Sequence, residues 1–486
     1  MVPMVKVKSL SDNLNAQFDE VHRSSAIFWI PPISIASSTI SILNYYTIKN
    51  NCQTKARLTW RLFNGTIVKT DNIDWSSFNV LNASTPDELL NCGGSVEFEA
   101  FSDQNLRIPY SAVMCIYETT KSVAFVHSYS RIYNENEDEA SLESILHREG
   151  CWTLKDTSFI TSSAVFHNGP NELNAQKANL TITNSLGKQL SASIPIPKLN
   201  PYETYLLTPK EYFCNLEEFL GGELGSAKIN FITSGAFGRM LLIWSNQSEK
   251  LLTVTHSNFN YSECTTDTLH SSEELCYARV PQLSGIQSSL ILYRDHTNNA
   301  FDYTDNTITR SPKDIDYYSP LVNEKVSQTV SFSPLTKESL PSRIVTGFLS
   351  PPDSSGNLGF ECSFGVMNAI YKPKRFHWAC VIPRLKSKII LSIYTELFDE
   401  PSDDTILNFS LYLPTSKDPI VAKVKLACID QQIFVDGLEV NKLFPQNTDL
   451  SNTQDACYIT LFAEYGGFVM FSTLEKENSF ALEHSF

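Results

Sequence analysis

The sequence SVEFEAFSDQNLRIPYSAVMCIYETTKSVAFVHS, from Ser95 to Ser128, is the clearest guide to the architecture of this chain. It contains a strand-like segment, a bend, a second such segment and a polar turn, and it ends in an apolar strand that closes on His-Ser. Two later stretches follow the same course, SAKINFITSGAFGRMLLIWSNQSEKLLTVTHS from Ser226 to Ser257 and ACYITLFAEYGGFVMFSTLEKENSFALEHS from Ala456 to Ser485. Three copies of one pattern indicate internal duplication.

Landmarks upstream of these stretches recur as well. ARLTWRLFNG at Ala56 to Gly65 resembles ANLTITNSLG at Ala178 to Gly187, and FWIPP at Phe28 is echoed by FHWACVIP at Phe376. The repeats are about 110 residues long, a usual domain size. We therefore expect an N-terminal extension at 1–23, β-sandwich repeats at 24–132, 150–262 and 374–486, an acidic linker at 133–149, and an irregular β-rich region or divergent fourth domain at 263–373.

Each repeat alternates apolar and polar residues over runs of five to eight, rich in Val, Ile, Phe, Tyr and Thr and broken by Gly, Pro, Asn and Asp. This pattern predicts strands. Only Glu139 to His147 and Pro209 to Phe219 suggest helix, and both are short. The sequence predicts an all-β chain of three tandem antiparallel β-sandwiches, immunoglobulin-like or jelly-roll-like.

Composition excludes several classes of function. The chain carries a formal charge of −15, from 38 Lys and Arg against 53 Asp and Glu, with one acidic cluster at Asn134 to Glu143. Binding to phosphates requires clustered cations, so we expect neither nucleic-acid nor anionic-membrane partners. No window approaches the run of about eighteen apolar residues that suggests a membrane span. The sequence contains no glycine-rich phosphate loop, GxSxG or HExxH motif.

The number and placement of the cysteines indicate whether the protein resides in a reducing or an oxidising compartment. Eleven are scattered along the chain without CxxC pairs, mostly inside apolar runs such as those around Cys115, Cys380, Cys428 and Cys457. We interpret them as buried free thiols. The first residues also lack the apolar core of a standard secretory signal. Together these features predict a cytoplasmic protein.

The histidine that ends each repeat has two interpretations. Successive strand residues alternate between faces, so each histidine shares a face with the apolar residues two and four positions before it. Each imidazole would then cap a backbone group at the edge of its own core. Alternatively, the repeats pack around a pseudo-threefold axis and bring His127, His256 and His484 together as ligands of one transition metal, Zn, Fe or Cu. A linear string of domains would keep the three apart.

Two weaker candidates remain. Arg294 to Pro320 is a polar stretch that suits a carboxylate pair, a Ca²⁺ loop or a solvated acidic loop, and it lacks the DxDxDG spacing of an EF-hand. Its acidic and histidine residues are Asp295, His296, Asp302, Asp305, Asp314 and Asp316. Aromatic residues beside turns suit a saccharide surface, although most strand aromatics belong to cores. These are Trp75, Trp152, Tyr202, Tyr205, Tyr317 and Tyr318.

The leading expectation is a non-enzymatic tandem β-sandwich protein that binds a saccharide or protein partner through repeated surfaces, with avidity where partners repeat. One alternative is a metal-dependent enzyme whose three-histidine centre lies where the repeats converge. Another is a structural subunit of an assembly. The sequence assigns no catalytic residue and no oligomeric state.

Overall fold

The structure is a computed structural model of the 486-residue chain. It describes residues 22–102, 111–127, 131–133, 145–146, 150–233, 239–257, 276–279, 287–293, 301–305, 308–310, 315–318, 329–334, 345–350, 358–363, 375–393, 406–425, 438–444, 450, 453–463, 468–477 and 479–484. The acidic cluster at Asn134 to Glu143 and Cys428 lie outside the described residues.

The chain is all-β, as the alternation of apolar and polar residues predicts. Its first part forms two antiparallel sheets, one in the order β1-β6-β3-β4 with β9 added beside β1, the other in the order β5-β2-β7-β8. Short helices α2 (Tyr45–Asn50) and α3 (Asp87–Leu90) lie in the connections. The strands are β1 (His22–Ile30), β2 (Ser37–Leu43), β3 (Lys55–Arg61), β4 (Ile67–Ile73), β5 (Val80–Ser84), β6 (Gly94–Ser102), β7 (Val113–Glu118), β8 (Val123–His127) and β9 (Arg131–Tyr133).

The second part repeats this strand order, as β11-β16-β13-β14 and β15-β12-β18-β19, with the small pair β10-β17 in addition. Its helices are η1 (Pro209–Glu211) and α5 (Leu216–Leu220). Its strands are β10 (Ile145–Leu146), β11 (Cys151–Leu154), β12 (Thr161–His167), β13 (Gln176–Thr183), β14 (Gln189–Ile196), β15 (Thr204–Leu207), β16 (Gly225–Asn230), β17 (Ile232–Thr233), β18 (Leu241–Asn246) and β19 (Leu251–His256).

Residues 276–363 contain the same order again, as β20-β25-β22-β23 and β24-β21-β26-β27. This is the stretch in which the sequence shows no matching landmarks. Its strands are β20 (Cys276–Arg279), β21 (Gln287–Tyr293), β22 (Phe301–Asp305), β23 (Ile308–Arg310), β24 (Ile315–Tyr318), β25 (Thr329–Pro334), β26 (Val345–Ser350) and β27 (Phe360–Ser363).

The last part has the orders β28-β33-β30-β31 and β32-β29-β34-β35. It contains η4 (Pro383–Leu385) and α7 (Val440–Leu443). Its strands are β28 (Arg375–Val381), β29 (Lys388–Ile393), β30 (Ile406–Tyr412), β31 (Ile420–Lys425), β32 (Leu438–Glu439), β33 (Cys457–Ala463), β34 (Phe468–Lys476) and β35 (Ser479–His484). We call the four sets the first to fourth sandwich. The third repeat of the sequence is thus the fourth sandwich, and the predicted domain boundaries stay predictions.

The strand order common to the four sandwiches contains eight strands in two sheets of four, which is the jelly-roll count, whereas a constant-type immunoglobulin sandwich has seven. In the second sandwich both sheets contribute to one apolar core, which includes Leu180 of β13 and Phe166 of β12. The burial of β14 alternates along the strand, as expected of a strand with one face on a core.

The two helix predictions have different outcomes. Pro209 to Phe219 contains η1 and α5, as predicted. Within Glu139 to His147 the structure describes Ile145–Leu146, which form β10 and pair with Ile232–Thr233, so helix is wrong there. A short helix is marginal in water, and pairing with a distant strand outweighs the local preference. Among the described residues, no helix has the length and apolar character needed to cross a membrane.

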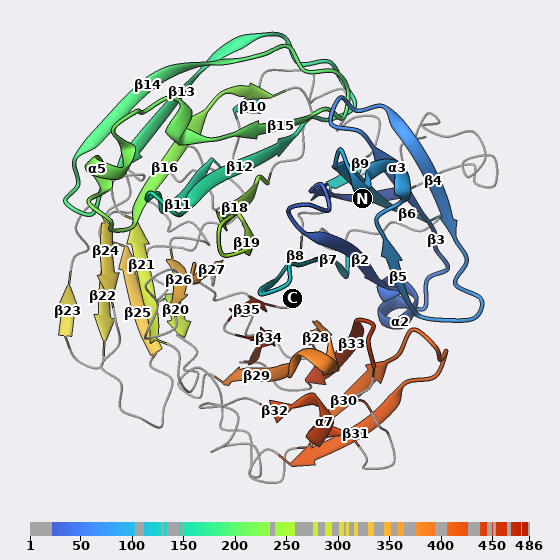
Figure 1. The fold of residues 1–486 in the computed structure, drawn as a ribbon. Coiled ribbons are helices and arrows are strands. Elements are labelled where there is room, and N and C mark those ends of the chain that lie inside the picture. Colours follow the sequence, from blue (N-terminus) through green and yellow to red (C-terminus); the bar gives the residue numbers. More distant parts are fainter. Residues whose placement is uncertain are drawn as a thin grey trace.

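The sandwiches form sectors around a centre in chain order, with β8, β19, β27 and β35 innermost (Figure 1). Each of these strands contacts the next around the centre, and β35 contacts β8, so the arrangement is closed. We call the line through this centre the axis. Four sandwiches surround it, where the sequence suggested a threefold arrangement.

Apolar packing continues from one sandwich to the next. The core cluster of the first sandwich includes Val254 from β19 and Tyr458 from β33. The Tyr458 hydroxyl donates a hydrogen bond of 2.7 Å to the carbonyl oxygen of Ser41 in β2. The arrangement of the sandwiches therefore rests on buried contacts as well as on chain connections.

Candidate metal centre

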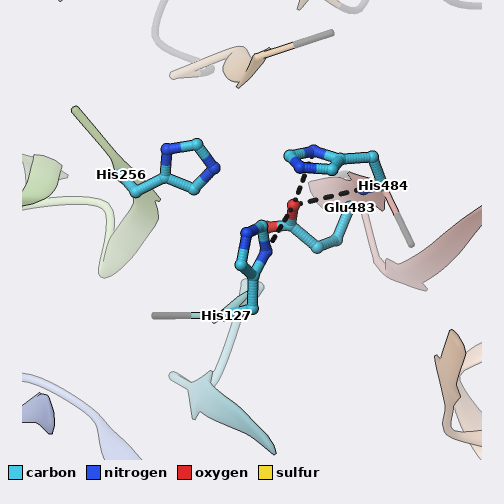
Figure 2. Close-up of side chains that lie close together, drawn as sticks. All are labelled: His127, His256, Glu483 and His484. Carbon is cyan, nitrogen blue, oxygen red and sulfur yellow. Dashed lines mark hydrogen bonds and ion pairs between the residues drawn. The ribbon is translucent and has the colours of Figure 1, made fainter. Parts of the chain in front are cut away.

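The three histidines predicted from the repeat come together at the axis (Figure 2). The ring centroid of His127 lies 4.8 Å from that of His256 and 4.7 Å from that of His484, and the last two are 5.7 Å apart. The three histidines therefore converge at one axis, as the second of the two interpretations expected, and do not lie apart in separate cores. Metal binding by these rings is a proposal that we take up below.

The topology explains why they converge. Strands β8, β19 and β35 are the innermost strands of their sandwiches, lie at the edge of their sheet and end on the histidine. Because these strands occupy equivalent positions around one axis, their ends meet there. Each histidine is at most 3% exposed. The imidazoles thus lie between sandwiches rather than at the rim of one core.

A carboxylate lies beside two of the three rings. Glu483 Oε1 lies 3.0 Å from Nδ1 of His127 and 3.1 Å from Nδ1 of His484 (Figure 2). One ligand atom from each of His127, His256, Glu483 and His484 can be chosen so that all four lie within 4.8 Å of one another. We call these four residues the axial cluster.

Sequence reasoning missed Glu483. It precedes His484, and strict alternation would direct its side chain to the opposite face of β35. At the last residues of an edge strand beside the axis, however, its carboxylate reaches both rings. The sequence does contain one indication of Glu483. Among the three repeats, only the last has an acidic residue directly before its histidine, and the equivalent residues are Val126 and Thr255.

A buried cation borders the cluster. Arg239 is 1% exposed, and its Nη1 lies 2.8 Å from Nε2 of His127. A guanidinium only donates hydrogen bonds, so this ring nitrogen accepts. In the neutral imidazole the other nitrogen, Nδ1, then carries the proton and faces the Glu483 carboxylate.

The electrostatics favour a neutral His127 ring and an ionised Glu483 carboxyl group. Burial lowers the pKa of His127 to about 3, although Glu483 opposes the shift. Burial would raise the pKa of Glu483, but attraction to His127 and hydrogen bonds from His127 and His484 lower it to about 2. Neutral imidazoles and a carboxylate are the forms in which these groups bind Zn²⁺ and other transition metals.

The spacing suits an ion after a small contraction. Zn–N distances are about 2.0–2.1 Å, so the ligand atoms of a tetrahedral site lie roughly 3.4 Å apart. The atoms of the axial cluster lie within 4.8 Å of one another. Side-chain movements of about 1 Å, small beside a rotamer change, would close the difference.

The aromatic candidates for a saccharide surface are mostly packed. Trp152 is 1% exposed, and Trp75 packs edge-on against Phe78. The Arg61 guanidinium lies 4.1 Å from the ring centroid of Tyr202. The Tyr205 hydroxyl is 3.3 Å from that of Tyr212.

Other candidates lie outside the described side chains. Among them are Tyr317 and Tyr318 and the acidic and histidine residues of Arg294 to Pro320. The described cysteines are free thiols, and Cys115, Cys380 and Cys457 are buried as predicted, whereas Cys92 and Cys214 are exposed.

Comparison with known proteins assigns no family. No protein-family model and no curated protein matches the chain. A solved calcium-binding mutant of Bacteroides uniformis beta-glucuronidase 2 aligns at 10% identity over 53% of this chain and 28% of that one, with a TM-score of 0.14. A crystal structure of Bacteroides uniformis beta-glucuronidase aligns at 8% identity over 53% and 27%, with a TM-score of 0.12. The chain spans little more than a quarter of either protein, and likenesses this weak carry no argument.

Proposed function

We propose that this chain is a closed β-sandwich scaffold whose sectors are held together at the axis by one transition-metal ion, Zn²⁺ in the first instance. The observation that carries the proposal is the axial cluster. It places three imidazoles and a carboxylate, from the inner strands of three sandwiches, within 4.8 Å of one another. Such a cluster offers the four nitrogen and oxygen donors of a tetrahedral site.

Burial favours a structural role over a catalytic one. The four side chains are 1–4% exposed. Structural zinc sites are closed by four protein ligands, whereas catalytic sites keep a position open for water or substrate. A metal-dependent enzyme would need both an open position and a route for substrate to the axis. The ion would instead add free energy of folding by joining sandwiches that are distant in sequence.

A scaffold of this kind suits binding to a protein or saccharide partner through the repeated outer faces of the sandwiches. The packed aromatics give no preference for a saccharide. The free cysteines are consistent with a reducing compartment such as the cytoplasm. These roles are expectations for the scaffold, and the axial ion is the part that a direct experiment addresses.

The test is the metal content of the full chain, purified without a His tag. We expect about one ion per chain in the wild type and none in the variant in which His127, His256 and His484 are all alanine. His167→Gln is the matched control, because His167 is equally buried but its Nδ1 contacts the Thr204 hydroxyl at 3.0 Å. This control should keep the ion.

A second measurement covers the case in which the triple variant does not fold. Wild type stripped of metal should gain thermal stability on addition of Zn²⁺, because an ion that binds only the folded state adds about 2.7 kcal/mol at 100 times its Kd. A wild type without metal and without a shift in Tm would contradict the proposal. The axial cluster would then be a hydrogen-bonded contact between sandwiches and nothing more.

A further inference from the structure

The third sandwich also sends a potential ligand to the axis. Its last strand, β27, contacts β19 on one side and β35 on the other. It carries Glu361-Cys362-Ser363, where β35 leads to Glu483-His484-Ser485. Cys362 therefore stands where each of the other three sandwiches has a histidine, and the His-Ser pattern does not include it.

Geometry places the Cys362 thiol beside His484, one residue of the axial cluster. Cys362 Sγ lies 3.7 Å from Nδ1 of His484, the same ring nitrogen that Glu483 approaches. Its side chain is 2% exposed. By contrast, the buried Cys115 and Cys380 belong to the apolar core cluster of the first sandwich. Cys362 is set apart by its position beside ionisable groups rather than by its burial.

The charges around Cys362 argue that the thiol is not held as a thiolate by the protein alone. Burial raises its pKa well above the ordinary value, and Glu483 and Glu361 raise it further. A thiol in such surroundings is unreactive until a cation arrives. The four equivalent positions thus carry three imidazoles and one thiol, and a bound metal ion would favour the thiolate form of Cys362.

We propose that Cys362 is the fourth ligand, so that the ion is held by one thiolate and three imidazoles, one from the innermost strand of each sandwich. Glu483 then accepts a ring N–H and orients its histidines, the usual role of a carboxylate beside a metal-bound imidazole. The inference rests on the proposed metal centre. When the sulfur binds, its proton leaves to water and no electron is transferred.

A sulfur ligand narrows the class of metal. Thiolate with imidazole suits Zn²⁺ and Co²⁺, whereas carboxylate with imidazole alone also suits harder ions. A Cys–His₃ set also gives every sandwich a direct bond to the same ion. With the axial cluster alone, the third sandwich would be held by packing only.

The test uses the full chain loaded with Co²⁺ or Zn²⁺. The Co²⁺ form of the wild type should show a sulfur-to-cobalt charge-transfer band in the near ultraviolet. X-ray absorption of the Zn²⁺ form should show one sulfur at about 2.3 Å beside nitrogen at about 2.0–2.1 Å. Cys362→Ser should lose both signals, and Cys115→Ser, a buried core thiol, should keep them.

The outcomes separate this inference from the metal centre. A wild type that binds about one ion per chain without a sulfur signal overturns the assignment of Cys362 and leaves the axial cluster as the site. A wild type that binds no ion overturns both. Because the wild-type spectrum already decides the question, the test stands even where Cys362→Ser or Cys362→Ala fails to fold.

Discussion

The Glu483 carboxylate lies 3.0 Å from Nδ1 of His127, so the last strand of the fourth sandwich contacts the last residue of the first sandwich's inner strand. Both side chains are buried. This contact joins the fourth sandwich to the first and so closes the ring of sandwiches. It uses an ionised carboxylate, although apolar packing alone could join the two sandwiches. It therefore contributes to the stability of the closed ring, and in the proposed metal centre its charge would also favour the cation.

Glu483→Gln keeps the shape of this side chain and removes its charge. We expect the free energy of unfolding to fall by about 1.5–3 kcal/mol, as for lost hydrogen bonds to a charged group. Metal affinity should fall about 10–100-fold, as for the loss of a carboxylate beside a ligand. Urea unfolding and competition with a chromophoric chelator measure the two. Glu249→Gln, which removes an exposed partner of Lys121, is the control and should change neither.

Stability of the metal-free protein should fall with acid. The pKa of His127 is about 3 in the folded protein against an ordinary 6.5, so the unfolded chain binds more protons between these values. The stabilisation is complete above pH 6.5 and decreases as pH falls toward 3, by up to about 1.4 kcal/mol per pH unit. Glu483, with a pKa of about 2 against 4.5, adds a loss of the same sign below pH 4.5.

Unfolding free energies measured at a series of pH values check this slope. His127→Gln should flatten it between pH 6.5 and 4.5, where Glu483 does not yet contribute. Burial also lowers the pKa of His167 to about 3, so His167 should still contribute to the pH dependence of stability in that variant. Equal slopes for wild type and His127→Gln would contradict the assignment.

Arg239 should compete with the ion. Its guanidinium lies 2.8 Å from Nε2 of His127, so it occupies a lone pair that a metal needs and repels a second cation nearby. Arg239→Met should therefore bind metal at least about 10-fold more tightly, a change of about 1.4 kcal/mol. Arg57→Met is the control, since Arg57 pairs with Glu99 in the first sandwich. It should lose stability with no change in affinity, and equal affinities for both variants would exclude competition.

Gly65 should be intolerant of a side chain because of a neighbouring sandwich. Its φ is +84°, and an added Cβ would lie 2.1 Å from the carbonyl oxygen of Pro201. Gly221 has a φ of +64° with open space around it. Gly221→Ala should cost about 1–2 kcal/mol, for the left-handed conformation alone. Gly65→Ala should lower the free energy of unfolding by clearly more, as measured by thermal or urea unfolding. Equal losses for the two variants would show that the backbone at Pro201 moves away at little cost.

The alternation of apolar and polar residues was sufficient to predict an all-β chain of sandwiches. The His-Ser ends also predicted which side chains could meet. Periodicity left residues 263–373 open as an irregular β-rich region or a divergent fourth domain, because residues 276–363 keep the strand order without the landmarks at Gly65 or Phe28. Strand order depends on pairing between distant segments, and such pairing leaves only a weak trace in local composition.

The axial cluster was predictable in part for the same reason. A repeat histidine indicates equivalence, but convergence depends on packing between sandwiches, such as the hydrogen bond from Tyr458 to Ser41. Glu483 and Cys362 differ from the residues at equivalent positions of the other copies. A comparison that looks for identical residues in the repeats overlooks them. Residues that differ between repeats can nevertheless add a different functional group to the axis, as the Glu483 carboxylate and the Cys362 thiol do.

The innermost strands have a further consequence for biosynthesis. Strands β8, β19, β27 and β35 are each the edge of a sheet, with one side of the backbone left without a strand partner in that sheet. Until β35 has been synthesised, β8 lacks one of its two neighbours at the axis, and its edge can pair with other chains. Domains generally fold in the order of synthesis. The first sandwich therefore folds before the fourth exists, and its inner strand β8 lacks its neighbour β35 until the fourth sandwich has been made. Ribosome-bound nascent chains that stop before β35 are thus the species in which protection by a chaperone matters most.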